Sequence, residues 1–524
     1  MSGQAIQLTF PWVADQGNGL YRNPILFADY SDPDVIRVGD DFYMTASSFN
    51  CVPGLPLLHS KDLVNWTIIN HVIRRLPFPV YDQPAHGNGV WAPSLRHHGG
   101  KFWVFFGDPD IGILMSTADD PAGRWSPLRL VKPAKGWIDP CPFWDDDGQA
   151  YLVHAFSKSR AGIKSILHVC RMRPDGMMLL DDGQLVFDGT QHHPTIEGPK
   201  LYKRNGYYYI FAPAGGVKPG WQTVLRSKNI FGPYEDRIVM AQGRTDINGP
   251  HQGGWVETQS GESWFMHFQD RGAYGRIVHL QPVTWVDDWP IIGEDADGDG
   301  VGDPVAAWRK PNVGQAYPIS IPQTSDEFDT DRLGLQWQWH ANPQLDWMSL
   351  TANPGHLRLY AARVLRDAAR VLEDADLWQT PNLLLQKLPA PAFTVTTRLT
   401  FSPELNGERA GLVMMGLDYV CVMLVKQGNG LRLAHYIKLE NGLMQEVESL
   451  DWPGRSACLR VSVRQGALCQ FSYSQDGETF EPIGHEFQAR EGRWIGAKVG
   501  LFCINPNRET SHGWADFDWF HFSP

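Results

Sequence analysis

The sequence has few cysteines, and their spacing gives them no structural role. Its seven Cys among 524 residues are scattered, odd in number and form no CxxC pair. Disulfide frameworks and structural zinc sites need closely spaced, paired cysteines. We therefore expect reduced, buried thiols rather than a disulfide-stabilised fold or a zinc-binding module.

Long apolar runs and an excess of positive charge are also missing. No stretch approaches the roughly 18 apolar residues of a membrane helix, and the formal net charge is −12. Nucleic acids and anionic membranes are bound through basic patches, so we predict neither as a partner. A neutral or weakly polar ligand is easier to accommodate. The sequence leaves a homo-oligomer open.

The first residues, MSGQAIQLTFPWVADQG, contain no basic region followed by an apolar core. A secretory signal needs both features. We therefore expect a cytoplasmic location, with an export signal that has been removed as the alternative.

Aromatic residues, in contrast, are plentiful. They make up 12% of the sequence and include 21 Trp. Packed β cores and sites that stack sugar rings both use many aromatics, so this feature alone does not separate the two. A chain of this length is too long for one ordinary domain, and its first 320 residues contain no convincing amphipathic helix.

A hairpin module recurs five times over these first 320 residues. In its clearest copy, EGPKLYKRNGYYYIFAP from Glu197, two apolar strands flank Asn205-Gly206, a turn pair that tolerates positive φ and strongly indicates a hairpin. The five turns lie near residues 40, 100, 147, 205 and 261, about 47 to 60 residues apart. Second hairpins follow four of the copies, so each unit would hold about four strands. This pattern predicts an all-β, five-bladed propeller.

The pattern changes after about 280 residues. A turn-rich acidic segment and a Pro-spaced segment from Lys310 have the composition of a linker. Alternating strands from about Ser325 onwards predict a β-sandwich. We predict a propeller domain over residues 1–322 and a sandwich domain over 323–524. The stretch ARVLRDAARVLEDADLWQ, from Ala362, has helical composition and is interpreted as a helix or an irregular insertion.

Three carboxylates, Asp32, Asp139 and Glu197, precede the first strand of a predicted blade. First strands line the channel of a propeller, so equivalent positions converge at one end of it. Like charges gathered there are costly unless they serve a purpose, and they would raise at least one pKa, as a general acid at neutral pH requires. The alternative is that Asp-Pro and Glu-Gly-Pro are simply turn formers.

Five motifs resemble those of glycoside hydrolase family 43, the five-bladed propeller β-xylosidases and α-L-arabinofuranosidases. The C-terminal part, from SDEFD to ADFDWFHF, resembles the β-sandwich of the longer xylosidases, which implies a concanavalin-like jelly roll. In those longer members a loop from the sandwich reaches toward the active site. The motifs are SDPDVIRVGDDFYMTASSF (from Ser31), HSKDLVNW (from His59), GVWAPSL (from Gly89), WIDPCPFWDDDG (from Trp137) and IEGPKLYKRNGYYY (from Ile196).

The resemblance implies a role for each carboxylate. Asp32 would be the general base that activates water, and Glu197 the general acid that protonates the leaving oxygen. Asp139 would stay ionised, raise the pKa of Glu197 and orient it. Family members invert the anomeric centre, which needs a water's width between acid and base. Asp34 is the alternative base, although Asp32, before Pro33, is the better match.

The resemblance also implies pocket residues. Arg276 matches the family's substrate-binding arginine, with a surface arginine as the alternative. Phe49, Trp91 and Ala92 match the wall around the terminal sugar, although each could equally be core. His251 matches a histidine near the channel axis, where the family often keeps a calcium ion or water, and calcium near His251 is the cofactor we consider.

An acidic loop at Asp295-Ala-Asp297-Gly-Asp299-Gly300 has the start of a calcium loop. It has Ala306 where the twelfth-position Glu belongs. We therefore interpret it as a solvated interdomain turn.

The function indicated is an exo-acting, inverting glycoside hydrolase that releases terminal xylose from xylo-oligosaccharides. Within the enzyme class the alternative is an α-L-arabinofuranosidase, or an enzyme with both activities acting on arabinoxylo-oligosaccharides. The alternative from another class is a carbohydrate-binding protein without catalysis, and retention of all three acids in their motifs counts against it.

Overall fold

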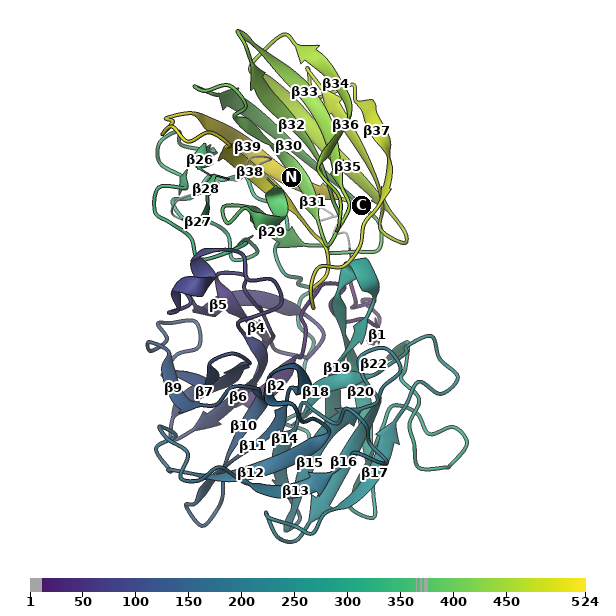
Figure 1. The fold of residues 1–524 in the computed structure, drawn as a ribbon. Coiled ribbons are helices and arrows are strands. Elements are labelled where there is room, and N and C mark those ends of the chain that lie inside the picture. Colours follow the sequence, from purple (N-terminus) through teal and green to yellow (C-terminus); the bar gives the residue numbers. More distant parts are fainter. Residues whose placement is uncertain (1–11, 364, 368–369, 372–375) are drawn as a thin grey trace.

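Five four-stranded antiparallel sheets form the first half of the chain and confirm the predicted propeller (Figure 1). The computed structural model describes residues 12–363, 365–367, 370–371 and 376–524. Each blade is built from one continuous stretch of chain. Blade 1 comprises β2 (Asp34–Val38), β3 (Asp41–Thr45), β4 (Gly54–Ser60) and β5 (Trp66–Ile73), and blade 2 comprises β6 (Trp91–His98), β7 (Lys101–Asp108), β8 (Gly112–Ala118) and β9 (Arg129–Pro133).

The remaining three blades repeat this order around the ring. Blade 3 comprises β10 (Trp137–Trp144), β11 (Ala150–Phe156), β12 (Ile166–Met172) and β13 (Gln184–Asp188). Blade 4 comprises β14 (Lys200–Arg204), β15 (Tyr207–Ala214), β16 (Trp221–Ser227) and β17 (Glu235–Met240). Blade 5 comprises β18 (His251–Glu257), β19 (Ser263–Asp270), β20 (Arg276–Val286) and β21 (Trp289–Ile292).

The turns predicted from the repeats are where the first two strands of each blade meet. Asn205 and Gly206, for example, have φ of 51° and 74° and join β14 to β15. The first strands then adjoin one another, because β18 contacts β2, β2 contacts β6, β6 contacts β10 and β10 contacts β14. Residues at the start of these strands therefore surround one axis.

The ring closes without a shared strand between blades 1 and 5. Trp66 of blade 1 and Trp264 and Leu280 of blade 5 belong to one buried cluster. Tyr21, in the same cluster, donates a hydrogen bond from its hydroxyl to the carbonyl of Leu280 (2.8 Å). The short strand β1 (Leu20–Arg22), which contains Tyr21, also pairs with β22 (Ala307–Arg309). This pairing joins the segment that precedes the five blades in sequence to the segment that follows them.

The second half of the chain is a sandwich of two sheets, antiparallel except where β26 pairs with β38, drawn in green to yellow in Figure 1. One sheet contains β23 (Gln338–Trp339), β26 (Ala362–Arg363), β29 (Leu384–Lys387), β31 (Arg409–Met415), β32 (Tyr419–Gln427), β33 (Gly430–Lys438), β34 (Gln445–Trp452) and β38 (Lys498–Asn505). The other contains β24 (Met348–Ser349), β25 (Leu357–Tyr360), β30 (Phe393–Ser402), β35 (Ser456–Arg464), β36 (Leu468–Ser474), β37 (Glu481–Gln488) and β39 (Trp514–Ser523). Alternate residues of β30 are buried, as its sequence predicts.

The stretch from Ala362 to Gln379 is not a helix in its described parts. It contains β26, a hairpin of β27 (Leu365–Asp367) and β28 (Arg370–Val371), and the 3₁₀ turn η3 (Leu377–Gln379). Residue 364 and residues 368–369 and 372–375 lie outside the described residues. The irregular-insertion alternative fits the described parts, because β26 pairs with β38 of the sandwich and tertiary pairing overrides the helical composition.

Helix is scarce elsewhere too. Within the described residues, the one α-helix is α1 (Lys158–Ala161), and η1 (Pro79–Asp82) and η2 (Gly272–Tyr274) are 3₁₀ turns. No helix in this part of the chain is long and apolar enough to cross a membrane. All seven cysteines are unpaired and buried, as expected.

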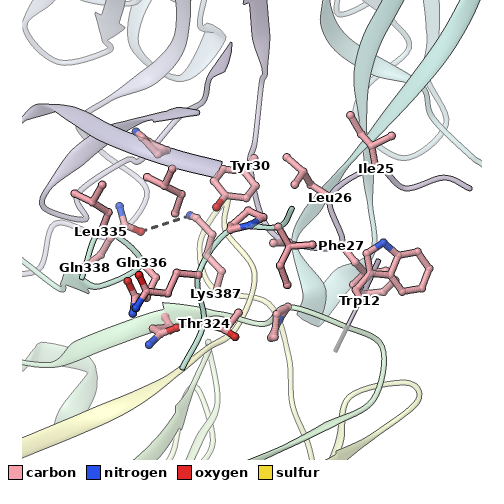
Figure 2. A pocket seen from close by; sticks show the side chains of 18 of the residues that line it. Trp12, Ile25, Leu26, Phe27, Tyr30, Thr324, Leu335, Gln336, Gln338 and Lys387 are labelled. Atoms are coloured by element: carbon pink, nitrogen blue, oxygen red, sulfur yellow. Dashed lines mark hydrogen bonds between the residues drawn. The ribbon is translucent and has the colours of Figure 1, made fainter. Parts of the chain in front are cut away.

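The two domains share a hydrophobic core. Phe27, Tyr274 and Ile277 of the propeller half are buried in the same cluster as the sandwich residues. Beside them, a cavity of about 60 Å³ at the junction contains no carboxylate in its wall. Figure 2 shows this cavity, with the Lys387 ammonium directed at the side-chain oxygen of Gln338 (3.5 Å). The sandwich is thus packed onto the propeller and not tethered by a linker alone.

Because the domains share a core, we predict that the full chain unfolds in one thermal transition. A chain that ends at Thr324 would expose Phe27 and Ile277, whose burial contributes about 1.5–3 kcal/mol each, and should unfold at a lower temperature. Differential scanning calorimetry measures both. Two resolved transitions in the full chain, or an unchanged melting temperature after truncation, would contradict the shared core.

Candidate active site

A ring of left-handed backbone positions marks the start of the five blades. The ring has one position of positive φ near the start of each blade: Asp32 (53°), Ala92 (31°), Asp139 (57°), Gly198 (61°) and Gln252 (25°). Such backbone is costly for residues other than glycine, at about 1–3 kcal/mol each, and persists where its surroundings enforce it. The ring therefore turns the chain sharply at five points around the channel axis.

This ring corrects one detail of the sequence interpretation. Asp32 and Asp139 are equivalent, but the residue equivalent to them in blade 4 is Gly198, so Glu197 lies one position earlier. Asp139 also lies inside β10, beside a break in register, and not before the strand. A side chain at Gly198 would not fit, because its Cβ would lie 2.4 Å from Gln252 Cγ. Aligning the repeats on the prolines that follow Asp32, Asp139 and Gly198 would have shown this offset.

One cavity of about 260 Å³ brings together every residue predicted for the site. It lies at the end of the channel where the ring of turns is found. Its wall includes Asp32, Phe49, Trp91, Ala92, Asp139, Glu197, His251 and Arg276. Asp34, the alternative base, is not among the residues of this wall. Its buried carboxylate instead accepts hydrogen bonds from the Arg96 guanidinium (2.7 Å) and the Leu95 N–H (2.8 Å) of blade 2.

Asp32 is oriented by three donors. The hydroxyls of Ser31 and Ser47 donate to its Oδ2 at 2.7 and 2.6 Å, and Arg276 Nη1 donates to its Oδ1 at 3.1 Å. The Ser47 hydroxyl in turn accepts the backbone N–H of Ala92 (2.8 Å). These contacts hold the carboxylate in one orientation against the cavity, where it can accept a proton from a bound molecule.

Asp139 is buried and bound mainly by the backbone of the next blade. Its Oδ2 accepts the N–H of Gly198 (2.7 Å) and the amide of Gln252 (3.2 Å). Burial raises its pKa to about 7, although the Gly198 N–H opposes this by stabilising the charged form. The bond to Gly198 also fixes the peptide that follows Glu197, so Asp139 orients the Glu197 segment directly.

Glu197 has the higher pKa of the two. Burial, together with the negative charges of Asp139 and Asp32, raises the pKa of this carboxyl to about 8, while the positive charge of Arg276 acts in the opposite direction. Its side chain remains 24% exposed, toward the cavity. At neutral pH Glu197 therefore keeps a proton and can donate it to a ligand.

His251 lies beside Glu197, with Nε2 3.6 Å from Oε1. Burial lowers its pKa to about 3, so the ring is neutral, and neither ring nitrogen has a hydrogen-bond partner among the described residues. The described residues bring no group of three His, Cys, Asp or Glu ligands together here. Calcium prefers six to eight oxygen ligands, so the side chains at His251 fit this ion poorly, and calcium there stays a prediction.

The acidic loop is the one place in the described chain where three such ligands gather. Oxygens of Asp295, Asp297 and Asp299 lie within 4.8 Å of one another. Asp295 accepts the backbone N–H groups of Gly298 and Gly300, at 2.8 and 3.1 Å. These bonds are those of a tight turn, which agrees with our interpretation of the loop.

Aromatic rings form the wall opposite the acids. Trp91 lies between Phe49 and Trp494, with ring centroids 6.4 Å from each. Trp494 comes from a sandwich loop and is 51% exposed. It is the main site residue that we missed, because nothing near it in the sequence marks it, although the resemblance implied a loop from this domain. Arg160, also missed, lies with its guanidinium carbon 5.7 Å from the Trp91 ring.

The cavity thus contains an oriented carboxylate, Asp32, and a carboxyl that stays protonated, Glu197. Hydrolysis of a glycosidic bond commonly uses two carboxyl groups, one of which keeps a proton that it can donate. Aromatic walls suit the apolar faces of sugar rings. The geometry therefore supports acid–base chemistry on a small carbohydrate.

Comparison with known proteins agrees with this interpretation over both domains. Residues 21–290 match the family model for glycosyl hydrolases family 43. Residues 325–523 match the model for the beta xylosidase C-terminal concanavalin A-like domain. By fold and site the protein is a glycoside hydrolase.

Individual relatives extend over nearly the whole chain. A putative beta-xylosidase of Xylanibacter ruminicola is 44% identical over 492 residues, covering 93% of this chain and 86% of its own. The non-reducing end alpha-L-arabinofuranosidase BoGH43B of Bacteroides ovatus is 29% identical, covering 96% and 94%. The crystal structure of xylan beta-1,4-xylosidase from Bacillus halodurans C-125 superimposes with a TM-score of 0.84 at 26% identity, covering 96% and 100%. This chain belongs to glycoside hydrolase family 43, which confirms the resemblance.

We predict that Asp139→Asn moves the alkaline limb of the pH profile to lower pH. Glu197 must be protonated to act, so activity falls as pH rises through its pKa. The Asp139 charge raises that pKa, and removing the charge lets Glu197 lose its proton earlier. The alkaline limb is measured from the pH dependence of kcat/KM, which reports the pKa values of groups in the free enzyme.

Asp145→Asn is the matched control. Asp145 lies in the same blade and is bound by Lys203 (2.5 Å), outside the cavity wall, so its loss should leave the limb unmoved. A limb that stays in place or rises in Asp139→Asn would contradict the assigned role.

Proposed function

We propose that this protein is an exo-acting, inverting β-xylosidase that releases terminal xylose from xylo-oligosaccharides. The observation that carries the proposal is the single cavity that contains both Glu197, a carboxyl whose raised pKa keeps it protonated, and Asp32, which is held by two hydroxyls and Arg276. Its volume of about 260 Å³ is below the range of about 300–1,000 Å³ for drug-sized ligands. A cavity of this size favours one terminal sugar over an internal stretch of polysaccharide.

The proposed chemistry assigns one step to each of the two carboxyls. A water molecule gives a proton to Asp32 while its oxygen attacks the anomeric carbon. Glu197 gives its proton to the glycosidic oxygen as the bond to that oxygen breaks. Attack and departure on opposite faces of the sugar invert the anomeric centre. Arg276 donates a hydrogen bond to Asp32, and the charges of Asp139 and Arg276 act on the pKa of Glu197 in opposite directions.

Xylose is the sugar that the relatives favour. The Xylanibacter ruminicola relative, at 44% identity, is called a putative beta-xylosidase, and the Bacteroides ovatus relative, at 29%, is an arabinofuranosidase. The second candidate is therefore release of α-L-arabinofuranose, alone or beside xylose. A binding protein without catalysis is disfavoured, because its site would gain nothing from burying a carboxyl whose pKa is about 8.

The proposal is tested with p-nitrophenyl β-D-xyloside and p-nitrophenyl α-L-arabinofuranoside, assayed side by side. We expect the larger kcat/KM for the xyloside. A larger value for the arabinofuranoside would replace xylosidase with the second candidate. Hydrolysis of neither, by a chain that is folded by circular dichroism, would contradict the enzyme.

We predict that Glu197→Ala and Asp32→Ala respond differently to the leaving group. A sugar is a poor leaving group, so its departure needs the proton of Glu197. Proton donation of this kind typically raises the rate about 10²–10⁴-fold. A dinitrophenolate needs it little. Glu197→Ala should therefore nearly abolish xylobiose cleavage and largely spare dinitrophenyl β-D-xyloside, whereas Asp32→Ala should impair both. Equal losses on both substrates in both variants would refute the assignment of acid and base.

A further inference from the structure

A buried carboxylate outside the cavity wall connects the two domains to the active site. Asp29, which is 3% exposed, lies three residues before Asp32. Its Oδ1 accepts the backbone N–H of Arg276 (2.9 Å), and its Oδ2 accepts the backbone N–H of Gly496 (2.9 Å). Gly496 belongs to the sandwich and follows Trp494 by two residues. One carboxylate thus holds the chain before the base, the arginine that binds the base, and the loop of Trp494.

Two glycines allow this contact. A Cβ at Gly275, whose φ is +72°, would lie 2.5 Å from Asp29 Cγ, and a Cβ at Gly496 would lie 2.7 Å from the Gly275 nitrogen. A side chain at Gly275 would displace Asp29, and a side chain at Gly496 would push the sandwich away from the propeller. The backbones of propeller and sandwich therefore meet directly at the residue before Arg276.

The segment before Arg276 is anchored in the sandwich. The hydroxyl of Tyr274 donates to the carbonyl of Pro391 (2.6 Å) and accepts the N–H of Ala467 (2.7 Å). The N–H of Ala497 donates to the carbonyl of Ala273 (2.7 Å). The turn η2 is thus inserted into the second domain, and Arg276 follows it at the start of β20.

The side chain of Arg276 contacts Asp32, the proposed base. Its Nη1 donates to Ser31 Oγ (2.6 Å) and to Asp32 Oδ1 (3.1 Å), and its guanidinium carbon lies 5.7 Å from the Trp494 ring centroid. Its carbonyl accepts the N–H of Tyr30 (3.1 Å). A shift of the Arg276 backbone would therefore reach Asp32 through a single side chain.

We propose that Asp29 is a positioning residue through which the sandwich domain sets Arg276 against Asp32 and places Trp494 at the cavity. This inference rests on the proposed function, because it assigns Asp29 a role in that reaction. Charge-assisted hydrogen bonds from two backbone N–H groups are short and directional. Asp29 fixes two elements from different domains relative to one another, and neither domain alone contains the complete site.

Asp29→Asn is the direct test. The amide keeps the shape of the carboxylate but offers one oxygen to two N–H donors, so one of the two bonds is lost. A misplacement of about 1 Å can cost about 10²-fold in rate, and we expect a loss of that order in kcat/KM on the aryl glycoside that the protein cleaves. The alkaline limb should also move to higher pH, because the Arg276 charge lowers the pKa of Glu197.

A double-mutant cycle separates positioning from a general loss of stability. If Asp29 acts through Arg276, then adding Asp29→Asn to the Arg276→Ala variant should lower kcat/KM by less than about a further 3-fold. This is measured on the dinitrophenyl glycoside. The matched control is Asp62→Asn. Asp62 is a buried carboxylate that accepts the N–H groups of Val64 and Asn65, at 3.0 and 2.8 Å, in blade 1. It should lower the melting temperature and leave the pH profile unchanged. The proposal would be overturned if Asp29→Asn lowers kcat/KM equally in the wild type and in Arg276→Ala and leaves the alkaline limb of the pH profile unmoved.

Two further measurements keep the inference testable if Asp29→Asn does not fold or if the wild type shows no activity. If Asp29→Asn does not fold, Tyr274→Phe, which removes the acceptor for Ala467, should lower kcat/KM and move the limb in the same direction. If the wild type cleaves no aryl pentoside, the proposed function fails by itself. A crystal structure of Asp29→Asn or Tyr274→Phe then decides the inference without substrate. Displacement of the Arg276 guanidinium from Asp32 supports it, and an unmoved guanidinium and Trp494 loop overturn it.

Discussion

Repulsion among three carboxylates in one cavity is the constraint on which the rest of this structure depends. Asp32 and Asp139 are at most 6% exposed, and both raise the pKa of Glu197. The protein offsets part of this repulsion with the Arg276 guanidinium and with hydroxyl and backbone donors. Burial and the repulsion that remains together raise the pKa of Glu197 to about 8, so this carboxyl keeps a proton. The same electrostatic cost leaves a group able to act as the acid that we propose.

The propeller makes this arrangement feasible because it brings the starts of five separate strands to one axis. Three blades supply one acid each, and the other two supply Trp91 and His251 at the position that Glu197 occupies in blade 4. The sandwich adds Trp494 and supports the turn that precedes Arg276. The second domain is in this sense part of the active site, and the shared core explains why the two domains have to be folded together.

Much of this could be predicted from local sequence. Turn pairs such as Asn205-Gly206 and the repeated aromatic strands indicate the blades, because hairpins are determined by neighbouring residues. The motifs identify the three carboxylates, and the prolines that follow Asp32, Asp139 and Gly198 contain the offset of Glu197, which an alignment on the carboxylates themselves does not reveal. Trp494 was missed because its place is determined by contacts between residues more than 200 positions apart.

The helical composition after Ala362 misleads for a related reason. Propensity is a weak local preference, and pairing of β26 with β38 decides the conformation there. Asp29 is a further example. Its sequence neighbourhood gives no sign of a role, and its importance follows only from two hydrogen bonds to residues about 250 and 470 positions away.

The central claim is that Asp32 and Glu197 carry out a single displacement by water. The most direct test is proton NMR of the anomeric signals during the first minutes of β-xyloside hydrolysis, before the released sugar mutarotates. The account predicts that α-xylose appears first, because water attacks from the face opposite the leaving group. First appearance of β-xylose would show two displacements through a covalent intermediate and would contradict the roles assigned to both carboxyls.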